Sequence, residues 1–106
     1  MIENHVAVII NDENYIIFDA VFMITAGQLR ASRALLDIDQ RTLAEAAGLS
    51  LPTIQRMEAC EGVIRGNVDS LMKLVAALDT LGVELISDNA TSHSGGRGVR
   101  LKRAPS

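Results

Sequence analysis

The apolar residues in the middle of the chain recur at helical spacing, and polar capping residues divide this stretch into four predicted helices. The first is predicted to start after Thr25, because Thr25 and Gln28 have the spacing of a capping box, and to run to about Leu36. Caps at Asp39, Ser50 and Asn67 predict the other helices at 40–47, 51–59 and 68–81. The clearest apolar stripe lies in the last helix, at Leu71, Leu74, Val75, Leu78 and Leu81.

Short apolar runs at both ends of the chain predict strands. The runs at 6–10 and 15–18 flank a turn-rich segment and predict a hairpin. The runs at 83–87 and 99–102 predict two more strands, joined by the polar, glycine-rich loop 89–98. The pattern therefore predicts a mainly α protein with short β-strands, as hairpins or a small sheet, at its N- and C-terminal ends.

Residues 40–58 carry the most informative pattern, which is two short helices bent around Gly48, where a left-handed residue costs glycine little. The predicted inner face is apolar: Leu43, Ala44, Ala47, Leu49, Ile54 and Met57. The predicted outer face is polar: Thr42, Glu45, Ser50, Thr53, Gln55 and Arg56. Two helices with a glycine turn and a polar second helix are typical of the helix-turn-helix, which lays its second helix in a DNA major groove.

This segment resembles the Cro/lambda-repressor-like helix-turn-helix family, also called the XRE family. The matching positions are Gln40, Leu43-Ala44, Gly48, Ser50, Ile54 and Glu58. With the flanking helices, the resemblance covers residues 24–82 and implies a lambda-repressor-like four-helix core. It also implies a sequence-specific, DNA-binding transcriptional regulator.

The resemblance divides the chain into an N-terminal hairpin extension at 1–22, a DNA-binding domain at 23–82, and a C-terminal hairpin with a basic tail at 83–106. Residues from Met23 onward resemble a usual start for this family. Residues 1–22 are therefore either a dimerisation hairpin or the product of a wrongly assigned start codon.

Alignment with the family motif implies which residues touch DNA. Base contacts are expected at Leu51, Pro52, Thr53 and Arg56, and a phosphate contact at Gln40. Ser50 suits both a helix cap and a phosphate contact. Further phosphate candidates are Arg41, Arg65 and Asn67, for each of which a solvated surface residue is the alternative. The planar fork of Arg56 suits guanine O6 and N7, although a contact to phosphate or solvent is the alternative. This helix has few polar side chains that could contact base edges, so recognition through DNA shape is also considered. Relatives commonly pair the positions of Arg33 and Glu58, so a salt bridge that orients the recognition helix is expected.

The net charge of −3 is unfavourable for DNA binding, but the distribution of charge matters more than its sum. Residues 1–24 hold four acids and no base, and residues 89–106 hold four bases and no acid. Those bases are Arg97, Arg100, Lys102 and Arg103. They either reach backbone phosphates or act as edge-strand charges that discourage aggregation.

Several classes of protein are excluded or disfavoured by composition. The 106 residues suit one small domain, and no apolar run approaches the ~20 residues of a membrane span. No signal peptide is expected, and the single cysteine, Cys60, excludes an internal disulfide, so a cytoplasmic location is expected. Cys60, His5 and His93 show no metal-ligand spacing, and no nucleophile–base pair appears. We therefore expect no metal, no cofactor and no enzymatic activity.

The leading hypothesis is a homodimer on double-stranded DNA, because one helix-turn-helix buries too little DNA for tight binding. The expected dimer surfaces are the hairpin at 6–18 and the strands at 83–87 and 99–102. One alternative is an antitoxin or phage-type accessory regulator that binds a protein partner. Another is a protein-interaction module that does not bind DNA.

Overall fold

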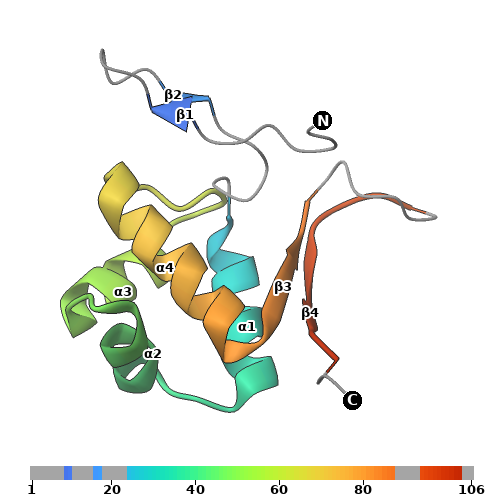
Figure 1. The fold of residues 1–106 in the computed structure, drawn as a ribbon, viewed down its shortest axis with the longest axis horizontal. Coiled ribbons are helices and arrows are strands. Elements are labelled where there is room, and N and C mark those ends of the chain that lie inside the picture. The colour runs from blue at the N-terminus through green and yellow to red at the C-terminus, as the bar shows by residue number, and fades with distance from the viewer. Residues whose placement is uncertain (1–8, 11–15, 18–23, 88–93, 104–106) are drawn as a thin grey trace.

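The computed structural model describes residues 9–10, 16–17, 24–87 and 94–103, and it is mainly helical, as predicted (Figure 1). The four helices are α1 (Ala26–Leu36), α2 (Gln40–Ala47), α3 (Leu51–Glu58) and α4 (Val68–Leu81). They precede the antiparallel strands β3 (Val83–Ile86) and β4 (Gly98–Leu101). The predicted N-terminal pairing is present between β1 (Ile9–Ile10) and β2 (Ile16–Ile17). The rest of that hairpin and residues 89–93 of the predicted loop at 89–98 lie outside the described residues.

Each helix begins at the side-chain cap that the sequence predicts. The hydroxyl of Thr25 accepts the Gln28 N–H at 3.0 Å, and Gln28 Oε1 accepts the Thr25 N–H at 3.0 Å, which completes the capping box. Asp39, Ser50 and Asn67 each accept the N–H of the residue three positions on, at the starts of α2, α3 and α4. Such caps are worth about 1 kcal/mol each, so local chemistry sets where the helices start.

The C-terminal end of α3 differs in backbone conformation from the ends of the other three helices. Three helices end at a left-handed residue: Asp37 (φ 58°), Gly48 (φ 70°) and Gly82 (φ 107°). Helix α3 instead ends at Glu58, one residue earlier than predicted, and its cap residue Ala59 is right-handed (φ −87°). The left-handed conformation after α3 falls on Gly62 (φ 78°), so Cys60 avoids the steric cost that an L-residue would meet there.

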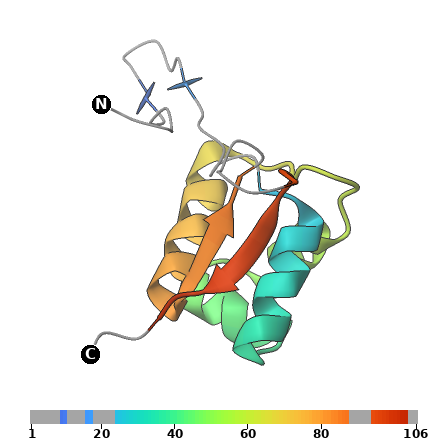
Figure 2. The ribbon, with the colours of Figure 1, turned by 90° about the vertical axis from the view of Figure 1, so that its right-hand side faces the viewer.

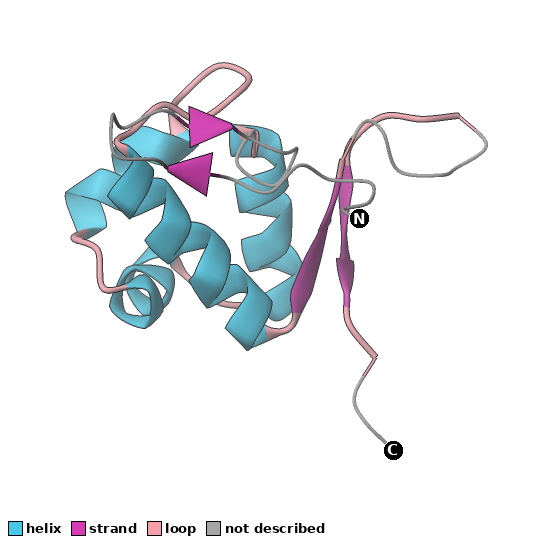
Figure 3. Ribbon diagram, turned by 45° about the horizontal axis from the view of Figure 1, so that its top comes forward, coloured by secondary structure: helices cyan, strands magenta, loops and turns pink. Residues whose placement is uncertain are grey.

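One apolar core joins the four helices to β3. The side chains of Leu29, Leu43, Ile54, Leu74 and Leu78 are fully buried, one or two from each helix. The predicted inner face of α2 and α3 is confirmed, except that Leu49 is only half-buried. Figure 3 shows the β3–β4 hairpin standing to one side of the helices. In Figure 2 the hairpin spans the space between α1 and α4, and Val83 enters the core there.

A buried glutamine fastens α1 to the far end of the hairpin. Gln28 Nε2 donates to the carbonyl oxygens of Ile86 (3.1 Å) and Gly98 (2.9 Å), which are paired residues of the β3–β4 ladder. The same amide accepts the Thr25 N–H through Oε1. Both donor hydrogens and the acceptor are therefore used, as a buried amide requires.

Candidate nucleic-acid interface

A three-residue turn at 48–50 sets α3 at an angle to α2. Gly48 ends α2 in the left-handed conformation, Leu49 packs against the core, and Ser50 caps the start of α3. The inner side of α3 is held by Ile54 and Met57, which are 0% and 2% exposed. The opposite side of the helix therefore faces away from the core.

The outer side of α3 carries an exposed ridge. Its four residues are three or four positions apart, as one face of a helix requires: Pro52, Gln55, Arg56 and Ala59. The predicted base-contact residues therefore divide into two kinds. Pro52 and Arg56 lie on the ridge, whereas Leu51 and Thr53 are half-buried beside it.

A line of hydroxyl groups holds the guanidinium of Arg56. The hydroxyl oxygens of Ser50 and Thr53 lie 2.8 Å apart, and Thr53 Oγ1 accepts a hydrogen bond from Arg56 Nη2 at 3.3 Å. Ser50 Oγ also accepts the Thr53 N–H at 3.2 Å. The Thr53 hydroxyl is therefore occupied by its neighbours on the helix, and it serves to position Arg56.

The structure brings four of the predicted contact residues to one hollow, of about 230 Å³, between α3 and the start of α4. It is lined by Thr53, Arg56, Met57, Arg65, Gly66, Asn67 and Ser70. The Asn67 side chain is already engaged as the α4 cap, where it accepts the Ser70 N–H at 2.7 Å. Arg56 and Arg65 thus lie beside a helix start, whose dipole also favours anions.

The ion pair predicted between Arg33 and Glu58 is present, and it is bidentate. Arg33 Nε donates to Glu58 Oε2 at 2.5 Å, and Arg33 Nη2 donates to Oε1 at 2.9 Å. The Glu58 side chain is only 5% exposed, and Arg30 Nη1 donates to the Glu58 carbonyl oxygen at 2.7 Å. Two arginines of α1 therefore fix the C-terminal end of α3.

Gln40 joins this network, which the family motif did not indicate. Its Nε2 donates to Glu58 Oε1 at 3.0 Å, so the amide that was expected to hold a phosphate lies against a carboxylate of the protein. Exposed Asp39 adds a second negative charge at the start of α2, and exposed Arg41 lies near it. Of the two phosphate contacts predicted on α2, Arg41 is exposed, whereas Gln40 is half-buried and bonded to Glu58.

The electrostatics of the network favour the ionised pair. Burial raises the pKa of Glu58, but hydrogen bonds from Arg33 and Gln40 outweigh burial, and the pKa lies below its usual value. The hydrogen bond to Glu58 raises the pKa of Arg33. The pKa of Asp39 is lowered as well, first by the backbone N–H of Thr42.

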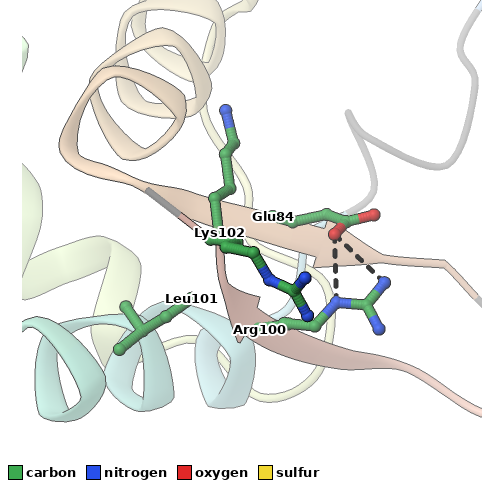
Figure 4. Close-up of a pocket in the computed structure, with 5 residues that line it drawn as sticks. Glu84, Arg100, Leu101 and Lys102 are labelled. Carbon is green, nitrogen blue, oxygen red and sulfur yellow. Dashed lines mark hydrogen bonds and ion pairs between the residues drawn. The ribbon is translucent and has the colours of Figure 1, made fainter. Parts of the chain in front are cut away.

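The basic C-terminal strand is partly neutralised by acids of its own fold. Arg100 Nε donates to Glu84 Oε1 at 3.1 Å across the hairpin (Figure 4). Lys102 pairs with the Asp79 carboxylate. Arg103 lines the hollow of about 520 Å³ beside them. These pairings favour the role of edge-strand charges over phosphate contact for Arg100 and Lys102.

Cys60 is half-buried, and its Sγ donates to the Arg56 carbonyl oxygen at 3.5 Å. Within the described residues, no three His, Cys, Asp or Glu side chains gather as metal ligands. None of the described helices is long and apolar enough to cross a membrane.

Sequence reasoning assigned Gln55 to the outer face but left it out of the contact set. The spacing of 52, 55, 56 and 59 would have placed it on the same ridge as Arg56.

No protein-family model matches this chain, and no curated protein matches its sequence.

Proposed function

We propose that this protein is a sequence-specific, DNA-binding transcriptional regulator with a lambda-repressor-like four-helix core, acting in the cytoplasm. The observation that carries the proposal is the exposed ridge of α3, on which Arg56 is held ready by Thr53. In this proposal α3 enters the major groove, and Arg56 pairs with guanine O6 and N7.

Backbone contacts flank this helix in the proposal. Arg65 and the start of α4 bind one phosphate, because two arginines and a helix start share a hollow there. Ser50 and Arg41, both exposed, contact the backbone on the α2 side. The Glu58 network has a positioning role, since it fixes α3 to α1 and α2 through side chains that do not themselves need to touch DNA.

The proposed active form is a homodimer, because two half-sites about one helical turn apart supply the contacts that one small helix-turn-helix lacks. The β3–β4 hairpin is the candidate dimer surface among the described residues, since it is a two-stranded sheet with open edges. The N-terminal hairpin is the other candidate from the sequence.

The test is binding of the purified chain to DNA upstream of its own coding sequence, measured by fluorescence anisotropy at several salt concentrations. We expect affinity to fall with salt, and Arg56→Ala to weaken specific binding by roughly 5- to 150-fold. Arg65→Ala should weaken all sequences alike and lower the salt slope by about 1. Lys73→Ala is the charge-matched control, because Lys73 already pairs with Asp69 on α4.

An interaction module without DNA binding is the second candidate. It is favoured by the net charge of −3 and by the exposed acids Asp39 and Glu45 on the α2 side. The same experiment separates the two, since this candidate predicts no salt-sensitive binding. Equal affinities of the wild type and Arg56→Ala would also contradict the DNA-reading role. An antitoxin-like regulator would bind DNA and a protein partner together.

A further inference from the structure

The ridge of α3 offers only two hydrogen-bonding side chains. Pro52 and Ala59 are exposed but apolar, which leaves Gln55 and Arg56. Leu51 lies beside the ridge and has no polar group, and the hydroxyls of Ser50 and Thr53 already bond to one another. The capacity of α3 to read donors and acceptors therefore rests on two consecutive residues.

The two residues differ in how they are held. Arg56 is braced by the Thr53 hydroxyl, whereas the Gln55 side chain makes no hydrogen bond or ion pair within the described part of the chain. The other two glutamines have internal partners, since Gln28 bonds to the β3–β4 hairpin and Gln40 bonds to Glu58. Gln55 is thus the one glutamine whose amide stays open to an outside partner.

An exposed amide has one natural match among base edges. Adenine presents the N7 acceptor and the N6 donor in the major groove, and a glutamine amide meets both at once. Arginine matches guanine instead, through two acceptors. Consecutive residues are about 1.5 Å apart along a helix axis, and neighbouring bases are ~3.4 Å apart along DNA. The side chains of two consecutive residues can therefore contact neighbouring base pairs.

We propose that Gln55 is a specificity-determining residue and that its amide reads an adenine next to the guanine read by Arg56. This inference rests on the proposed function and extends it, because it names one base that the half-site must contain. It also accounts for a recognition helix with few polar groups, since both of its readers are bidentate.

The test is selection of bound duplexes from a random DNA pool with the full chain, carried out on the wild type and three variants. The wild-type half-site should contain neighbouring adenine and guanine columns. Gln55→Ala should keep the guanine column and lose the adenine preference, with about 10- to 100-fold weaker binding to the wild-type site. Gln55→Glu should turn the adenine preference toward cytosine, because a carboxylate only accepts and cytosine N4 donates.

Thr80→Ala is the control, since Thr80 is also an exposed polar residue but lies near the C-terminal end of α4, and it should return the wild-type motif. A Gln55→Ala motif identical to that of the wild type would overturn the inference and leave the proposed function standing. Loss of a column other than adenine would overturn the base assignment. A wild-type pool with no enriched motif would overturn the proposed function itself.

Discussion

Helix α1 is joined to its neighbours by two buried polar anchors that differ in charge. Toward its C-terminal end, Arg33 meets the Glu58 carboxylate of α3. At its start, the neutral amide of Gln28 binds two carbonyl oxygens of the β3–β4 hairpin. The residues Glu58 and Gln28 are both only 7% exposed. Glu58 and Gln28 are therefore buried alike, and charge is what distinguishes these two residues.

Because of this difference in charge, the two anchors differ in the free energy that desolvation costs them. A buried ion pair loses much of its attraction to desolvation, so its main contribution is to fix the orientation of α3. A fully satisfied amide carries no net charge to desolvate and holds the hairpin irrespective of the protonation of acids. Helix α3 is thus joined to α1 through an ionisable contact, whereas the hairpin is joined to α1 through a neutral one.

The largest effect is expected when one side of the ionic anchor is removed. Glu58→Ala should lower the free energy of unfolding by about 3 kcal/mol, because it leaves the half-buried Arg33 guanidinium without its partner. This is the lower end of the usual range, since the Arg33 side chain keeps 23% exposure to water. Urea denaturation would measure the loss.

The double variant Arg33→Met with Glu58→Met is the control for that prediction. It should cost less than Glu58→Ala, because it removes both charges and with them the desolvation penalty. If the double variant loses as much free energy of unfolding as Glu58→Ala, or more, the orienting role is contradicted. The pair would then stabilise the fold in its own right.

The neutral anchor at Gln28 should lose stabilising free energy when a charge is introduced there. Gln28→Glu places a carboxylate oxygen against the carbonyl oxygens of Ile86 and Gly98, and we expect a loss of about 2 kcal/mol at pH 7. Protonation restores a donor, so the loss should shrink as the pH falls. Thermal unfolding at pH 7 and pH 4 would measure this. A loss that stays constant with pH would argue against the amide contacts.

The ionic anchor should show the opposite pH dependence in the wild type. The folded pKa of Glu58 is depressed, so its contribution is present above the unfolded value of about 4.3 and is lost as the pH falls through the folded pKa. Stability should therefore decline more steeply in acid for the wild type than for the Arg33→Met, Glu58→Met variant. Urea unfolding from pH 7 to pH 3 would test this, and parallel profiles would contradict it.

The smallest effect is expected at the exposed pair of the hairpin. The Arg100 and Glu84 side chains are 64% and 48% exposed, and such surface pairs contribute about 0–1 kcal/mol. Glu84→Ala should therefore change the urea midpoint only slightly. A loss as large as that of Glu58→Ala would show that charge pairing matters equally on the surface and in the interior.

Local signals in the sequence were sufficient for the helices. Caps at Thr25, Asp39, Ser50 and Asn67 and the left-handed stop at Gly48 were all predicted and are all present. Each cap joins residues three positions apart, so a short segment contains both partners. The Arg33–Glu58 pair came from the family resemblance instead, because its partners are 25 residues apart.

The tertiary structure decided which polar groups remain free. The motif position of Gln40 indicated a phosphate contact, but helix packing brings its amide to Glu58, 18 residues away. The second role of Gln28 depends on carbonyl oxygens 58 and 70 residues further along the chain. By itself, the sequence determined where all four helices start and where three of them stop, because those partners are neighbours in the chain. Only the packed fold decided which side chains serve the interior and which stay exposed, because that choice depends on distant segments coming together.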